Sequence, residues 1–145
     1  MPSKLRIAAV QPVDGMLALT IDWNNGKRHT VDLSVFLDQF PALAPLKDTE
    51  RFSHAAVDEW GFDVTWGDDL ELAASTLHRL ALEQSGEVMP TRDFKQWMVN
   101  NKLSLSAAAI ELGFTRRTIT AYSSGAALIP KHVALACRGW EYEHR

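Results

Sequence analysis

A segment near the C-terminus, residues 103–125, constrains the fold most strongly because it places a glycine between two helical runs that each follow a capping residue. Ser104 precedes the run 105–112, and Thr115 precedes the run that starts at Arg116. Serine and threonine are favoured at this position because the side-chain oxygen accepts a hydrogen bond from the first turn. Gly113 stands where a left-handed helix end needs a residue without Cβ. The pattern predicts two short helices joined by a tight turn.

The apolar residues of this segment have the spacing that packing two such helices requires. Ala109 is small where the helices would cross, and Ile119 is placed to face back toward it. The predicted inward set is Ala108, Leu112, Phe114, Ile119 and Tyr122. Two flanking helices complete the pattern, one capped by Thr91, the other starting at Pro130 with the inward stripe Val133, Ala136, Cys137 and Trp140. These features predict an all-α helix-turn-helix domain over residues 91–145. A helical hairpin without a DNA role is the alternative.

Residues 93–140 resemble the phage-repressor or Cro-type family, also called lambda-repressor-like or Xre-like, most closely from Leu103 to Gly125. The resemblance implies that the third helix lies in the major groove of double-stranded DNA. It also implies that Arg116, Arg117 and Ala121 face bases and that the ends of this helix approach phosphates. The predicted DNA-binding residues are Ser104, Thr115, Arg116, Arg117, Thr120, Ala121 and Ser124. Two departures are Leu105, where relatives often have glutamine, and Ala126-Ala127, where basic residues are common.

The helical period supports the same face. With Ile119 inward and 100° per residue, Arg117, Ala121 and Ser124 lie close to the outward side, and Arg116 lies nearer the flank. An arginine can make two hydrogen bonds to guanine, worth about 1–3 kcal/mol of discrimination. The alternative interpretation of the arginine pair is two solvated side chains.

The first half of the chain has a different pattern, typical of antiparallel hairpins followed by one helix. Runs at 6–10, 16–23 and 28–33 predict strands, and Asn24-Asn25-Gly26 predicts the turn between the last two. A second hairpin is predicted around Gly61, from strands at 55–60 and 62–66, ending at Gly67-Asp68-Asp69. Ser34 is expected to cap a short helix, and 73–82 predicts an amphipathic one. The tryptophans of this half, Trp23, Trp60 and Trp66, are expected to fill a small core.

Residues 5–82 resemble a family of small bacterial α+β domains of unknown function. The matching features are the strand ending in Trp23, the Asn25-Gly26 turn, Val31-Asp32-Leu33, Phe52, and Trp66 to Leu70 followed by a helix with Leu77. Some members of that family stand alone beside toxin-like genes, and others are fused to a C-terminal DNA-binding domain. The resemblance implies no enzymatic activity. The expected fold is therefore α+β: an antiparallel-hairpin sheet with a helix, then an all-α lambda-repressor-like domain.

Charge also divides the chain. Residues 1–88 hold seven lysines and arginines against fourteen carboxylates, whereas residues 89–145 hold eight against four. This asymmetry favours polyanion binding by the second half, although chance surface composition explains it equally well. Glycine and proline near 84–90 predict a linker, with domains at 1–83 and 91–145.

The remaining composition excludes several classes. A single cysteine, Cys137, excludes an internal disulfide framework and a multi-cysteine zinc site. Histidine and acidic residues are not in metal-ligand spacing, and no catalytic motif is present, so neither an enzyme nor a cofactor is expected. No apolar run is long enough for a membrane helix. We expect a cytoplasmic, homodimeric DNA-binding transcriptional regulator. The alternative is an antitoxin-like module that binds a basic toxin-like partner and uses DNA binding for autoregulation.

Overall fold

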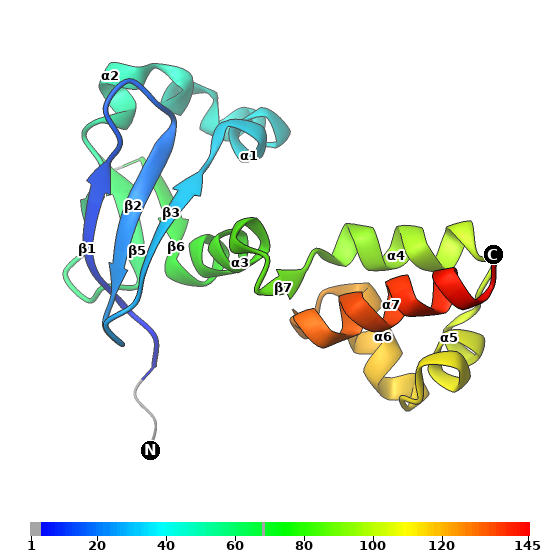
Figure 1. Cartoon of the computed structure of the whole chain (residues 1–145). Helices are drawn as coiled ribbons and strands as arrows, with labels where there is room; N and C mark the ends of the chain where they lie inside the picture. The colour runs from blue at the N-terminus through cyan, green and yellow to red at the C-terminus, as the bar shows by residue number, and fades with distance from the viewer. Residues whose placement is uncertain (1–3, 68) are drawn as a thin grey trace. The chain divides into compact units, whose positions relative to one another are not determined.

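The structure is a computed structural model that describes residues 4–67 and 69–145. The chain divides into two compact units, Met1–Gln84 and Ser85–Arg145, called unit 1 and unit 2 below. Unit 1 combines antiparallel strands with helices, and unit 2 is mainly helical (Figure 1). Each unit has its own core of buried apolar side chains.

The first sheet of unit 1 forms as the sequence predicts. It has the order β1-β2-β3, all antiparallel, with β1 at Ile7–Pro12, β2 at Ala18–Trp23 and β3 at Arg28–Asp32 (Figure 1). Leu19 and Ile21 on β2 are fully buried, whereas the intervening Thr20 is partly exposed. The period-2 alternation of a half-buried strand therefore positions this sheet over the core.

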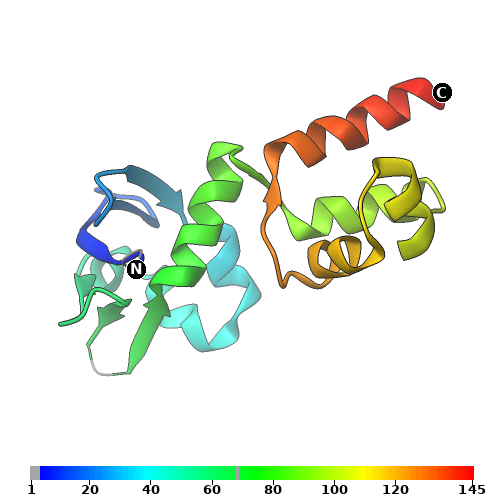
Figure 2. The same cartoon turned by 90° about the horizontal axis from the view of Figure 1, so that it is seen from below.

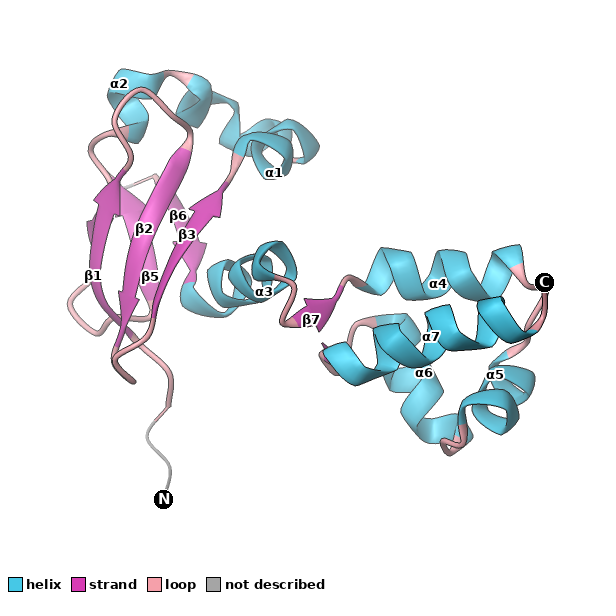
Figure 3. Cartoon of the chain, viewed as in Figure 1, coloured by secondary structure: helices cyan, strands magenta, loops and turns pink. Residues whose placement is uncertain are grey.

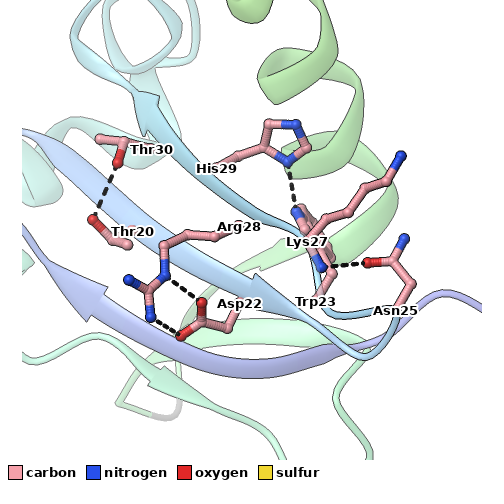
Figure 4. Close-up of polar contacts among 8 residues, drawn as sticks. All are labelled: Thr20, Asp22, Trp23, Asn25, Lys27, Arg28, His29 and Thr30. Carbon is pink, nitrogen blue, oxygen red and sulfur yellow. Dashed lines mark hydrogen bonds and ion pairs between the residues drawn. The ribbon is translucent and has the colours of Figure 1, made fainter.

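Side-chain pairs reinforce the hairpin of β2 and β3. Figure 4 shows three contacts between the strands: Trp23 Nε1 donates to His29 Nδ1 at 2.8 Å, Arg28 Nε pairs with Asp22 Oδ1 at 2.5 Å, and the Thr20 and Thr30 hydroxyls lie 3.2 Å apart. In the turn that joins the strands, the Lys27 backbone N–H donates to Asn25 Oδ1 at 3.0 Å. Thr20 and Thr30, and Asp22 and Arg28, lie directly opposite each other on the two strands, and such pairs favour the observed register.

The second sheet differs from the prediction. Its strands are β4 (Ala56–Val57), β5 (Asp63–Trp66) and β6 (Leu70–Ala73), in that order. The strand predicted at 55–60 is wrong beyond residue 57. The Asp58 carboxylate accepts hydrogen bonds from the N–H groups of Phe62 (2.9 Å) and Asp63 (3.3 Å), which holds the chain in a turn. Trp60 on this turn is 64% exposed, so it does not fill the core.

The predicted end of the hairpin is confirmed, since β5 ends at Trp66, but an unpredicted third strand follows. Leu70–Ala73 returns as β6 and pairs with β5 from Trp66↔Leu70 to Asp63↔Ala73. Asp68, in the turn expected to be a solvated acidic loop, lies outside the described residues. Asp69 is exposed and pairs with Arg51 at 2.9 Å. Because β6 has only four residues, three of them apolar, its alternation is too brief to predict a strand.

Four helical segments complete unit 1: α1 (Ser34–Gln39), the 3-10 helix η1 (Pro41–Lys47), α2 (Thr49–Phe52) and α3 (Ala74–Ser85). Ser34 is the first residue of α1 and not its cap, since its side chain contacts the Asp32 carboxylate instead of the helix backbone. This contact lowers the pKa of Asp32. Helix α3 extends three residues beyond the predicted 73–82.

The core of unit 1 lies between the two sheets, α3 and the short helices. The Trp23 and Trp66 side chains are buried, as predicted, and Trp66 Nε1 donates to the Phe52 carbonyl at 2.9 Å. The fully buried residues of this core are Leu19, Ile21, Val31, Leu33, Leu46, Val64 and Leu77. A buried indole needs a partner for its N–H, and the Phe52 carbonyl provides one here.

The last turn of α3 is attached to β3 by one side chain. Gln84 Oε1 accepts from the Asp32 backbone N–H at 2.8 Å, and Gln84 Nε2 donates to the Asp32 carbonyl at 2.7 Å. Strand β3 is an edge of its sheet, so its outer backbone groups have no strand partner. The amide of Gln84 satisfies both groups of one edge residue.

Substituting Gly61 by alanine is expected to destabilise unit 1 by about 3 kcal/mol, because two costs combine there. Gly61 has a positive φ of 79°, and an added Cβ would lie 2.8 Å from the Ile7 carbonyl oxygen. Gly26 is the matched control, with φ of 84° and nothing within 4 Å of an added Cβ, so Gly26→Ala should cost about 1 kcal/mol. Thermal unfolding measured by circular dichroism checks the difference. Equal losses would contradict the steric contribution.

Unit 2 contains four helices and one small two-stranded ladder. The helices are α4 (Thr91–Asn100), α5 (Leu105–Leu112), α6 (Arg116–Ser124) and α7 (Lys131–Glu143), coloured from yellow-green to red in Figure 2. Strands β7 (Val88–Met89) and β8 (Ile129–Pro130) pair antiparallel. Figure 3 shows β7 as a strand. The all-α prediction is therefore wrong in this detail, and the stretch predicted as a linker, 84–90, contains the end of α3 and β7.

The apolar core of unit 2 involves all four helices. Phe94, Ala108, Ile119 and Val133 have no exposed surface, and Trp97 is 4% exposed. Trp97 Nε1 donates to the Cys137 carbonyl at 3.1 Å, which joins α4 to α7. Two local predictions are wrong: Thr91 begins α4 without capping it, and Ala136 is exposed. The buried stripe of α7 follows Val133 and Cys137 at i and i+4, which turns Ala136 toward solvent.

The thiol of Cys137 is expected to be unreactive in the folded protein. Burial, with a smaller contribution from Glu141, raises its pKa from 9.0 to about 12. Between pH 9 and 12 the unfolded thiol loses its proton while the folded thiol keeps it. The contribution of Cys137 to the free energy of unfolding is therefore fully present below pH 9 and decreases as the pH rises from 9 to 12. A thiol reagent at pH 8 should label the native protein far more slowly than the protein in guanidinium. Cys137→Ala should lose stability less steeply between pH 9 and 12, and an unchanged profile would contradict this assignment.

Candidate nucleic-acid interface

The start of α6 is held in place by its cap and by the turn before it. Thr115 Oγ1 accepts from the Thr118 backbone N–H at 3.2 Å. Gly113 ends α5 in the left-handed conformation, with φ of 77°, and the Phe114 N–H donates to the Ala109 carbonyl at 2.9 Å. These are the capping features that the sequence predicts for residues 104–115. They fix the direction in which the first turn of α6 presents its side chains.

Two side chains anchor the inner side of α6. Ile119 is fully buried, and Tyr122 is 9% exposed with its ring edge-to-face against Phe94 and Phe114. The opposite side of α6 is therefore outward. We call the outward set Arg117, Thr120, Ala121 and Ser124 the α6 face. Its members are exposed except Ala121, which is partly buried.

The arginines that open α6 are exposed and take part in no ion pair with any residue of 4–67 or 69–145. Arg117 belongs to the α6 face, and Arg116 lies toward its flank. Both side chains follow directly on the capped N-terminus, where backbone N–H groups and the helix dipole favour an anion. This arrangement suits phosphate or guanine as a ligand, since guanidinium groups bind both through paired hydrogen bonds.

Three hydroxyl groups of α6 donate to the helix backbone, whereas the Thr118 hydroxyl lies 3.0 Å from the Thr115 hydroxyl. Thr120 Oγ1 donates to the Arg116 carbonyl at 2.9 Å, Ser123 Oγ to Thr120 at 3.1 Å, and Ser124 Oγ to Ala121 at 3.3 Å. Their hydrogens are therefore already used inside the helix. Ser104 is exposed at the start of α5, and its oxygen accepts from the Ala107 N–H at 3.0 Å, which is a capping role.

Two of the departures from the repressor pattern, Leu105 and Ala127, have a structural explanation. Leu105 is partly buried and packs against the core of unit 2, as does Ala127, so both contribute to folding. Ala126 is exposed. Lys102, Lys131 and His132 are also exposed basic or titratable residues of this unit. Lys102 closes α4 with a positive φ of 56°, a conformation more typical of glycine or asparagine, so its residue type did not predict it.

A contact that the sequence pattern did not predict joins α5 to α7. Trp140 Nε1 donates to Glu111 Oε2 at 3.2 Å, and the Trp140 ring packs edge-to-face on Trp97. Glu111 had no assigned role in the sequence because a carboxylate on an exposed helix position resembles any solvated residue. The contact holds α5, and thus the turn before α6, against the last helix.

Unit 1 has pockets among its described residues. One pocket, of about 360 Å³, is lined by Lys4, Leu5, Phe62, Asp63, Ala73, Ala74, Ser75 and His78. Across residues 4–67 and 69–145, no three histidine, cysteine or acidic side chains are grouped so that they could hold a metal ion. Within the same residues, no helix has the length and apolar character needed to cross a membrane.

Comparison with known proteins places unit 1 in a family. Residues 7–83 match DUF2442, a family described as protein of unknown function. The chain belongs to the DUF2442 family. The match agrees with the resemblance seen over residues 5–82 and ends before unit 2. No protein with curated annotation matches the chain.

A solved structure extends the similarity of this DUF2442 chain into unit 2. It is the crystal structure of Putative DNA Binding Protein NE0471 from Nitrosomonas europaea ATCC 19718. The two proteins are 34% identical, with a TM-score of 0.57, and the similarity covers 97% of this chain and 90% of that chain. Because the aligned part includes nearly the whole chain, it takes in helices of unit 2 as well as the DUF2442 unit.

Proposed function

We propose that this protein binds double-stranded DNA in a sequence-specific manner through a lambda-repressor-like helix-turn-helix in unit 2. In this proposal α5 and α6 are the two helices of the motif, and α6 enters the major groove. The observation that carries the proposal is the pair of exposed arginines, Arg116 and Arg117, at the capped start of α6, without ion-pair partners among the described residues. The similarity of 97% of this chain to a solved structure named Putative DNA Binding Protein NE0471 supports it.

The proposed consequence of binding is transcriptional regulation in the cytoplasm, and not catalysis. An operator-bound protein acts by occupancy, so no reaction centre is required. The expected base contacts are made by Arg116, Arg117 and Ala121, with Thr120 beside them, whereas Thr115 and Ser124 approach phosphates and Ser104 lies close to the DNA backbone. The Ser124 hydroxyl donates to the Ala121 carbonyl in the free protein, so it has to turn away from that carbonyl to donate to a phosphate. Phosphate contacts position the protein, and base contacts provide the sequence preference.

Selection of bound duplexes from a random pool tests the proposal directly. The full chain should enrich one sequence motif. The double variant Arg116→Ala/Arg117→Ala should enrich none, whereas Arg138→Ala, which removes an exposed arginine of α7, should enrich the same motif as the wild type. Absence of enrichment with the wild type would contradict sequence-specific binding.

The protein is also expected to bind DNA as a homodimer. One motif offers few base contacts, and Leu105 and Ala126-Ala127 remove contacts that relatives often have, whereas specific sites usually need affinities of ~10⁻⁸ M or tighter. Two copies would contact half-sites roughly 34–36 Å apart. Sedimentation at micromolar concentration should give two chains per particle, either free or bound to the selected duplex once the mass of the duplex is subtracted. A monomer under both conditions would contradict the expectation.

A second candidate function is binding of a basic, toxin-like partner protein by unit 1. It is favoured by the acidic charge of residues 1–88 together with exposed apolar side chains on this unit, Val35 at 68%, Phe40 at 46% and Trp60 at 64%. The two functions are compatible, since an antitoxin can bind DNA to regulate its own gene. Co-purification with the product of an adjacent gene would support this candidate, and Trp60→Ala should weaken the complex.

A further inference from the structure

The chemistry of the α6 face limits which bases it can recognise. Helix α6 consists of arginine, threonine, isoleucine, alanine, tyrosine and serine residues only. Adenine is usually read by an asparagine or glutamine amide, and cytosine by a carboxylate that accepts from its amino group. Neither side-chain type occurs in α6. Beyond the arginines, base recognition by this helix must use hydroxyl or methyl groups.

The hydrogen bonds within α6 favour methyl contacts, because they occupy hydroxyl hydrogens and leave only the acceptor lone pairs of those hydroxyls to a base. The hydrogen of the Thr120 hydroxyl is used in the bond to the Arg116 carbonyl, 2.9 Å away, although the residue is exposed. The methyl group of Thr120 is therefore the part of the side chain without a partner inside the helix. Ala121, its neighbour on the α6 face, contributes only a methyl group. Together they place two apolar groups beside Arg117 on an otherwise polar surface.

We propose that Thr120 and Ala121 recognise the 5-methyl group of thymine in the major groove. This inference rests on the proposed DNA-binding function and specifies its ligand. Thymine is the base with a methyl group at that edge, and alanine and threonine methyl groups are suitable contacts for it. Arg117 lies three and four residues earlier on the same face, a rise of about 5–6 Å. The thymine is therefore expected within about two base pairs of the guanine that Arg117 contacts.

Deoxyuridine provides the probe, because it differs from thymine only by lacking the methyl group. In the duplex enriched by selection, thymines are replaced one at a time by deoxyuridine, and the full chain is titrated in mobility-shift assays. At the contacted position the wild type should bind about fourfold more weakly, which is the effect of losing one buried methyl group. Replacements outside the motif provide the reference.

Matched variants assign the effect to the side chains. Thr120→Ser keeps the hydroxyl and removes the methyl group, whereas Thr120→Val keeps the methyl group and replaces the hydroxyl with a second methyl group. The ratio of affinities for the thymine and deoxyuridine duplexes should fall toward one in Thr120→Ser and stay near the wild-type value in Thr120→Val. Ala121→Gly should also lower this ratio. Any loss of helix stability affects both duplexes equally and cancels in the ratio.

The outcomes separate this inference from the proposed function. An enriched motif that tolerates deoxyuridine at every position would overturn thymine recognition while leaving DNA binding intact. A preference for thymine that persists in both Thr120→Ser and Ala121→Gly would also overturn it, since another residue would then be responsible. Failure of the selection itself would overturn the proposed function, and thymine recognition with it.

Discussion

Trp97→Ala is expected to unfold unit 2 and to abolish DNA binding. Trp97 is 4% exposed, packs against Phe94 and Trp140, and donates its indole N–H to the Cys137 carbonyl. Replacing a buried tryptophan by alanine costs about 3–5 kcal/mol, and the unpaired carbonyl adds to this loss. A small domain has a total stability of roughly 5 kcal/mol, so the variant should have no stable unit 2.

Hydrogen exchange followed by mass spectrometry can measure this outcome, because it reports each unit separately. Helices α4 to α7 should lose protection, while strands β1 to β3 should keep it. Val99→Ala on the same helix is the control, since Val99 is 70% exposed and its truncation should change stability by at most about 0.5 kcal/mol. Protection of unit 2 in Trp97→Ala would show that the core tolerates the cavity.

Arg117→Ala is expected to weaken binding to the selected duplex by about 1–3 kcal/mol, or roughly five- to 150-fold, and to relax the preference at one base position. The reason is that Arg117 is exposed on the α6 face without an ion-pair partner among the described residues. Mobility shifts on the selected and on a scrambled duplex measure the effect. The fold should be unchanged because Arg117 makes no core contact.

Two results would change the role of Arg117. An equal loss on both duplexes would show a phosphate contact, because such contacts carry no sequence preference. No loss on either duplex would remove this residue from the interface. Arg138→Ala serves as the control, since it removes the same charge from unit 2 without touching α6.

The pattern of residues 103–125 predicted local structure well because several independent signals coincide there. Ser104 and Thr115 are caps, Gly113 is left-handed, and Ile119 is buried, as expected. Each signal depends on backbone chemistry within a few residues, so the rest of the fold hardly affects it. The DNA-binding roles of Arg116, Arg117, Thr120 and Ala121 stay predictions, because a side chain's exposure does not identify its ligand.

Prediction was weaker where distant residues decide the structure. Trp60 has the residue type of a core position, but the turn organised by Asp58 directs it to solvent. Strands β7 and β8 have two residues each and stabilise each other across about 40 positions of sequence, so neither has a periodicity of its own. The Trp140–Glu111 contact depends in the same way on the packing of α5 and α7.

The attachment of Gln84 to Asp32 has a consequence for solubility. An uncovered edge strand is a template on which a strand of another molecule can assemble. The Gln84 amide occupies the N–H and C=O of Asp32, which are the groups that an incoming strand would use at that end of β3. The C-terminal turn of α3 thus hinders the addition of a strand from another molecule at this end of β3. Gln84 resembles an ordinary surface glutamine in the sequence, yet it satisfies both outer backbone groups of an edge-strand residue.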